Sequence, residues 1–127
     1  MSALILDHTA VDLLARWQRR LVEQVAAAEH DPARRVFIPA LSLAAAEEFR
    51  PGLSEVVCAT PQITIIPLGT SGAYCMGKLI SSGTDWRYAQ AIYEGRPTPE
   101  FPKGRAVATA APEHYAGTGV TVVPVSL

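Results

Sequence analysis

Two aspartates stand where the sequence could place chemistry. Asp7 directly follows a short apolar run, residues 3–6, and Asp85 directly precedes a segment with helical periodicity. A carboxylate at the end of a buried strand loses solvation free energy unless it is paired or binds a metal ion. As alternatives without a function, Asp7 favours the dipole of a following helix and Asp85 caps one. If folding brings the two together, they can hold Mg²⁺ or Mn²⁺, which prefer oxygen ligands.

Two adjacent glutamates, Glu47 and Glu48, close an alanine-rich helical segment. Neighbouring residues point about 100° apart around a helix, so at most one of them can face a site. Glu48 lies one turn beyond Ala45 on the same face and is the candidate metal ligand. The alternative for Glu48 is a place on a solvated helix surface. His8, beside Asp7, either ligates a metal ion or faces solvent.

Five short apolar runs alternate with segments of helical character. The runs predicted as strands are residues 3–6, 36–38, 63–68, 106–108 and 120–123. The first helical pattern begins with a capping box at Thr9–Asp12 and continues through Trp17 to residue 31. Further helical patterns are predicted over residues 41–49, 53–59, 71–80 and 85–93, with one helical turn at residues 112–115. Alternation of this kind predicts one α/β domain over residues 1–127, with a short, mostly parallel sheet of about five strands between two helix layers.

Ligands of open parallel sheets bind beyond the carboxyl ends of the strands. The predicted strands place Asp7, residues 39–42, residues 69–70 and Thr109 at that edge. Neither a Gly-x-Gly-x-x-Gly nor a Walker A segment occurs, so the sequence predicts no nucleotide cofactor. Two cysteines match no zinc spacing.

Composition limits the classes of partner. The 127 residues carry a net charge of −1 and include 49% apolar residues, so no overall attraction to nucleic acid or membrane is implied. Arginine pairs at 19–20 and 34–35, with Arg87, Arg96, Lys103 and Arg105, form either a phosphate-facing patch or ordinary solvated faces. No apolar run is long enough for a membrane span, and the N-terminus lacks the pattern of a signal peptide, so a cytoplasmic location is expected.

The order of these segments resembles the PIN-domain family. The carrying residues are Leu4–Val11 (strand, Asp, then Thr two positions on), Phe37–Ala44, Ile63–Leu68, Asp85–Ala89, Ala106–Thr109 with Pro112–Tyr115, and Val120–Val125. The resemblance covers nearly the whole chain and implies a PIN-like three-layer α/β/α fold. It also implies a metal-dependent ribonuclease of the VapC toxin type, which cleaves single-stranded or structured RNA with water activated by Mg²⁺ or Mn²⁺.

The resemblance assigns roles to individual residues. Asp7 and Asp85 match family acids, and Thr9 and Thr109 match polar site residues; Glu48 would complete a metal site with the two aspartates. An antitoxin protein and a second copy of the chain, as a homodimer, are the partners it implies.

Two further family acids are missing. They would fall near Ala45 and Ala111, neither of which can bind a metal. Two carboxylates alone bind Mg²⁺ weakly, because the hydrated ion gives up water reluctantly. The alternative is therefore a degenerate PIN-like domain that binds RNA or a protein partner without cleavage.

Overall fold

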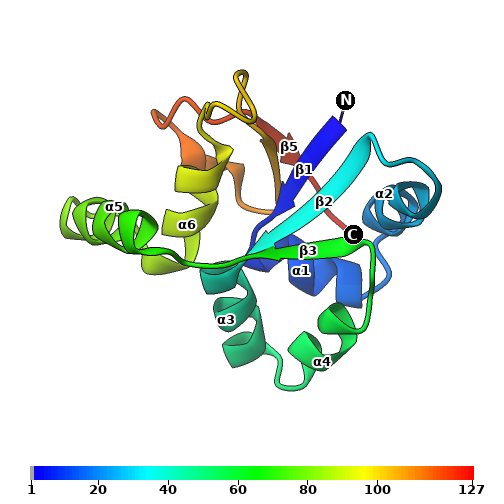
Figure 1. Ribbon diagram of the computed structural model, residues 1–127. Helices are drawn as coiled ribbons and strands as arrows, with labels where there is room; N and C mark the ends of the chain where they lie inside the picture. The colour runs from blue at the N-terminus through cyan, green and yellow to red at the C-terminus, as the bar shows by residue number, and fades with distance from the viewer. Residues whose placement is uncertain (1) are drawn as a thin grey trace.

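A five-stranded parallel sheet forms the centre of the molecule (Figure 1). The computed structural model describes residues 2–127. The strands are β1 (Ser2–Leu6), β2 (Arg34–Pro39), β3 (Ile63–Ile66), β4 (Ala106–Thr109) and β5 (Val122–Pro124), and their order across the sheet is β3-β2-β1-β4-β5. β1 lies at the centre and pairs with both β2 and β4. All carboxyl ends therefore meet along one edge, and Asp7 follows the central strand.

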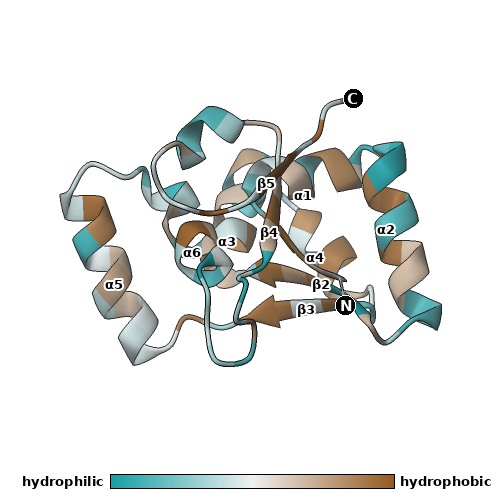
Figure 2. Ribbon diagram, turned by 90° about the horizontal axis from the view of Figure 1, so that it is seen from above, coloured by the Kyte–Doolittle hydropathy of each residue, from teal (hydrophilic) through white to brown (hydrophobic). Residues whose placement is uncertain are grey.

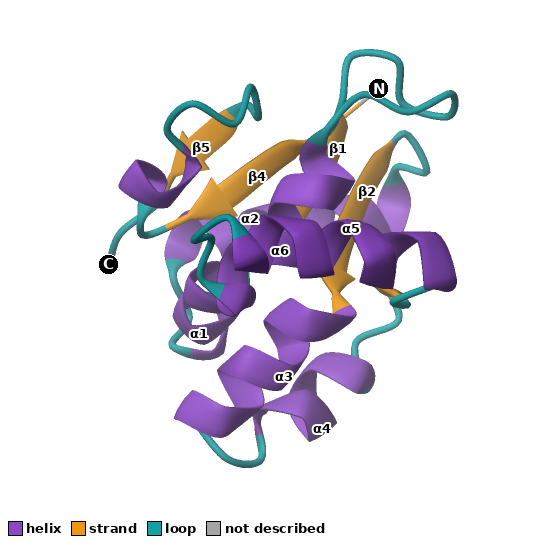
Figure 3. Cartoon of the chain, turned by 90° about the vertical axis from the view of Figure 1, so that its left-hand side faces the viewer, coloured by secondary structure: helices purple, strands orange, loops and turns teal. Residues whose placement is uncertain are grey.

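Helices cover both faces of this sheet, giving three layers. They are α1 (His8–Ala15), α2 (Arg19–His30), α3 (Ala40–Phe49), α4 (Leu53–Cys58), α5 (Thr70–Ser81) and α6 (Trp86–Gly95), with a 3₁₀ turn at Pro112–Tyr115. α1 and α2 lie on one side of the sheet and α6 on the other, with α5 packed outside α6 (Figures 1 and 3). No helix among residues 2–127 has the length and apolar character that crossing a membrane requires.

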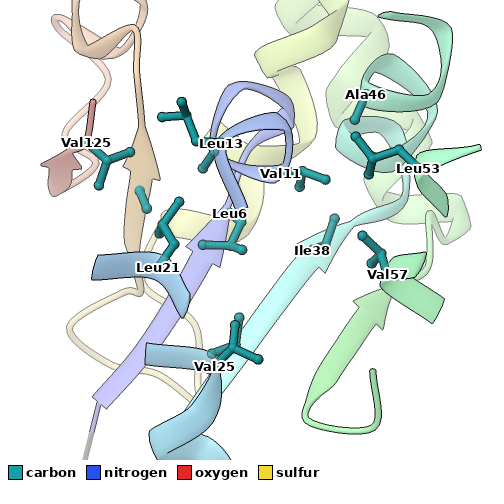
Figure 4. Packing of buried hydrophobic residues seen from close by; sticks show 13 residues of the cluster. Leu6, Val11, Leu13, Leu21, Val25, Ile38, Ala46, Leu53, Val57 and Val125 are labelled. Carbon is teal, nitrogen blue, oxygen red and sulfur yellow. The ribbon is translucent and has the colours of Figure 1, made fainter. Parts of the chain in front are cut away.

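The alternation of strand side chains builds a separate core on each face. Leu6, Val36 and Ile38 face α1, α2 and α4, where they pack with residues such as Val11 and Leu21 (Figure 4). Ile5, Phe37 and Val107 point the other way and pack on α6 and the loop that carries Phe101. Because both faces are covered, the strands are apolar along most of their length (Figure 2).

The predicted elements are confirmed in type and order, with one exception. The pattern that predicts one long helix through Trp17 is wrong there, because two helices meet at residues 16–18. Gln18 begins α2 by accepting a hydrogen bond from the amide of Leu21. Trp17 has a φ of 60° and is 80% exposed, so it does not pack in the core as its spacing suggested.

The predicted capping box at Thr9 is also wrong. Asp7 caps α1, and its Oδ1 accepts the amide of Ala10 at 3.0 Å. Thr9 lies inside the first turn, and its hydroxyl donates to Asp7. Asp7 and not Thr9 is the cap because an ionised carboxylate accepts a stronger hydrogen bond from amides at a helix N-terminus than a hydroxyl does.

Candidate functional site

Asp7 is fully buried at the carboxyl end of the central strand. Its Oδ1 accepts hydrogen bonds from the hydroxyl of Thr9 at 2.6 Å and from the amide of Ala10, while its Oδ2 accepts the hydroxyl of Tyr115 at 2.7 Å. Three donors therefore compensate the desolvation of this carboxylate. The sequence left its role open between a paired group and a metal ligand, and the structure shows it paired.

The two threonines of the predicted site tie the end of β4 to the start of α1. The hydroxyl oxygens of Thr9 and Thr109 lie 3.3 Å apart. Since Thr9 gives its proton to Asp7, Thr109 is the donor of this pair, and the Thr9 oxygen also accepts the amide of Ala110 at 2.8 Å. The threonines thus complete a buried polar network around Asp7.

Tyr115 is the member of this network that sequence reasoning missed. It lies on the 3₁₀ turn, 108 positions beyond Asp7, and is only 4% exposed. Burial, with the neighbouring negative charge of Asp7, raises the pKa of its phenol, so the hydroxyl stays protonated and donates. Its only signal in the sequence is an aromatic residue with a hydroxyl in the predicted helical turn.

Asp85 caps α6, which is the alternative without a function that the sequence offered for this residue. Its Oδ1 accepts the amide and the Nε of Arg87, at 3.0 and 3.1 Å, and its Oδ2 accepts Nη2 of the same residue at 2.6 Å. Hydrogen bonding to Arg87 lowers the pKa of Asp85 to about 2. Both oxygens of this carboxylate are therefore engaged by one guanidinium, in the bidentate geometry that arginine favours.

An aromatic cluster joins the two aspartates. Tyr88, in the first turn of α6, stacks on His114 with ring centroids 4.1 Å apart, and it meets His8 edge-on at 4.8 Å and Tyr115 at 5.8 Å. The charges of both Asp7 and Asp85 act on His8 and on Tyr88. We call Asp7, Thr9, Asp85, Tyr88, Thr109 and Tyr115 the rim; beside it a polar cavity of about 290 Å³ opens between Asp85, Tyr88 and His114.

The two glutamates of α3 have different surroundings. Glu47 accepts the amides of Gly52 and Ser54 and the hydroxyl of Ser54, so it fixes the turn before α4. Glu48 is exposed, and its charge acts on Arg87. At the two positions of the missing acids, Ala45 is buried and Ala111 is half-buried.

The rim does not fit a divalent metal ion. Among residues 2–127, no three His, Cys, Asp or Glu side chains lie close enough together to hold one. The oxygens of Asp7 are filled by internal donors, and those of Asp85 face the guanidinium of Arg87. Mg²⁺ needs near-octahedral oxygen ligation, which the described side chains do not supply.

Most of the arginines that could form a phosphate-facing patch are neutralised by acids. Arg19, Arg34, Arg35, Arg87 and Arg105 pair with Glu23, Asp31, Glu100, Asp85 and Glu94, respectively. Arg105 is also buried, with its guanidinium over the rings of Phe37 and Phe101. Among the described residues, Arg20, Arg96 and Lys103 are the members of this predicted patch without an ion pair.

An apolar groove of about 530 Å³ lies on the face of the sheet that α1 and α2 cover, between α1, α2, α4 and β3. Leu14, Trp17, Val22 and Val56 line it, and Glu29 is its charged lining residue. Trp17 stands at the junction of α1 and α2 with its side chain in solvent. A left-handed φ is strained for a bulky residue, and strain of this kind collects at functional positions.

Together, the fold and these two features define an α/β protein whose sheet order is consistent with a PIN-like three-layer fold. Comparison with protein-family models and with curated proteins finds no match. Any function must therefore be argued from the site and the groove.

Proposed function

We propose that this chain is a PIN-like domain that binds a protein partner and does not cleave RNA. The observation that carries the proposal is the contrast between its two surfaces. The rim acids are engaged by donors of the chain itself, whereas the groove beside Trp17 is open and apolar. Tryptophan is one of the residue types most enriched among binding hot spots.

The partner that suits this groove is an amphipathic helix of another protein. Helix-in-groove binding places an apolar helix face against walls formed by helices. The single carboxylate in the lining, Glu29, favours a basic residue beside the apolar anchors of that helix. In the VapC-type lineage that the sequence resembles, such a partner would be an antitoxin, encoded by a small neighbouring gene.

A binding measurement tests this proposal. The probe is a synthetic amphipathic helical peptide with a lysine beside its apolar face, titrated calorimetrically into the wild type, Trp17→Ala and Trp86→Ala. Loss of a hot-spot tryptophan costs about 2 kcal/mol or more, so Trp17→Ala should bind at least about tenfold more weakly. Trp86, 37% exposed on α6, is the matched control and should bind like the wild type. Equal binding by both variants contradicts the assignment of the groove.

A metal-dependent ribonuclease is the second candidate, because Tyr88, three residues after Asp85, contacts Tyr115, which donates to Asp7. A labelled single-stranded RNA should stay intact with Mn²⁺ as it does with EDTA. Cleavage that requires Mn²⁺ and disappears in Asp85→Asn would establish the ribonuclease and overturn the non-cleaving proposal.

A further inference from the structure

Arg87 is a cation that the chain places on its own acidic rim. Its guanidinium makes two hydrogen bonds to Asp85, and 45% of its side chain is exposed. The carboxylate it binds is 27% exposed, so solvent and ions can reach the pair. The backbone amide of Arg87 makes a third bond to the same carboxylate. This last bond does not depend on the side chain, so the helix cap survives replacement of the arginine.

A second acid, Glu48, contributes to the electrostatic environment of this guanidinium. Hydrogen bonding to Asp85 raises the pKa of Arg87 most, and the charge of Glu48, on α3, adds a small contribution in the same direction. α3 packs against α6, so Glu48 lies on the helix next to the one that carries Arg87, although among the described residues it forms no ion pair with Arg87. Asp7 remains closed off, because it is buried and holds three donors. Asp85 is thus the accessible carboxylate that the structure pairs with Arg87.

We infer that Arg87 is the internal counter-cation of the rim and excludes divalent ions from it. A dication would have to displace the guanidinium from both oxygens of Asp85 or bind beside a fixed positive charge. Either path is unfavourable, because like charges a few ångströms apart repel strongly and a bidentate pair is lost. Replacing the arginine by a neutral residue therefore creates a weak divalent-ion site at Asp85. This inference does not depend on what occupies the groove.

The test is Mn²⁺ binding by Arg87→Gln, followed by the paramagnetic relaxation of water protons at neutral pH and low salt. The wild type should bind Mn²⁺ no better than Asp85→Asn. Arg87→Gln should bind it more tightly than the wild type by on the order of tenfold or more, because one positive charge is gone. Adding Asp85→Asn to Arg87→Gln should abolish the gain, and adding Glu48→Gln should reduce it.

Two variants separate this explanation from a general effect of charge. Arg19→Gln removes an arginine from an exposed ion pair with Glu23 on α2, so it changes the net charge equally and should leave Mn²⁺ affinity unchanged. Arg87→Lys keeps the positive charge and should also remain without a gain. Thermal melts confirm that each variant is folded. The inference is overturned if the wild type binds Mn²⁺ as tightly as Arg87→Gln, if the folded Arg87→Gln gains nothing, or if Arg19→Gln or Arg87→Lys gains as much.

Discussion

At the scale of single residues, Asp7 shows how a buried charge is made tolerable. The carboxylate lies at 0% exposure, and each of its donors comes from a different kind of group: a threonine hydroxyl, a helix amide and a tyrosine phenol. Charge-assisted bonds of this type are roughly twice as strong as neutral ones. The aspartate therefore organises the rim and holds the 3₁₀ turn against the central strand.

Replacing Tyr115 by Phe tests this role. The substitution keeps the packing of the ring and removes one donor from a buried carboxylate. We expect a loss of about 1.5–3 kcal/mol in the free energy of unfolding, the usual range for a hydrogen bond to a charged group. Urea denaturation measures it. Tyr74→Phe on α5, where the ring is 67% exposed, is the matched control and should change stability little; equal stability of both variants would contradict the network.

The sequence allowed part of this site to be predicted. Asp7 and Asp85 follow from the ends of predicted elements, and Asp85 was already a candidate cap. Arg87 was counted only as part of a basic patch, because spacing does not say whether a side chain folds back on a residue two positions earlier. The contact of Tyr115 with Asp7 depends on the packing of the last turn against the sheet, which no local pattern encodes.

At the scale of elements, the Pro-rich loop after α6 is held by close backbone approach. Gly104 has a φ of 77°, and a Cβ at this position would lie 2.5 Å from the carbonyl oxygen of Gly95. Arg105, next in the chain, binds the carbonyl and the carboxylate of Glu94. The loop therefore lies against the end of α6, and β4 follows from it.

Gly104→Ala should destabilise the protein by more than its backbone angle alone explains. A left-handed φ costs a residue with a Cβ about 1–2 kcal/mol. The clash with a backbone atom should add about 1–3 kcal/mol. Gly117→Ala is the control, because its φ is 76° and nothing lies within 4 Å of an added Cβ. Denaturation of both variants isolates the clash; equal losses would show that the loop moves away at no cost.

Helix and strand order could be predicted because the apolar runs are short, separate and buried on both faces. The break between α1 and α2 could not, since Val11, Leu14, Leu21 and Val25 keep helical spacing across it. Trp17 occupies a left-handed backbone conformation that its residue type does not favour. Gln18 caps α2, although glutamine is not among the residues that most favour the N-cap position. The signal for this turn lies in tertiary packing.

At the scale of the whole molecule, His8 connects the rim to the stability of the fold. It follows Asp7 at the start of α1, its ring contacts Tyr88 of α6, and its Nδ1 is buried without a hydrogen-bond partner among residues 2–127. Burial lowers the pKa of His8 below its usual value of 6.5, and the charge of Arg87 acts in the same direction, against the charges of Asp7 and Asp85 and the backbone of Arg87, which raise it. Protonation of this imidazole therefore opposes the packed state.

The sign of the pH dependence follows from this lowered pKa. In the unfolded chain His8 takes up a proton as the pH falls through about 6.5, while the folded protein still resists it. The unfolded state then binds more protons, so the free energy of unfolding should decline as the pH falls from 7.5 to 5. His8→Gln should flatten this decline, whereas His30→Gln, at the exposed end of α2, should leave it as in the wild type. Urea denaturation at several pH values gives both slopes. If His8→Gln keeps the slope of the wild type, the half-buried imidazole does not couple the rim to folding, and the contact between α1 and α6 does not depend on its charge.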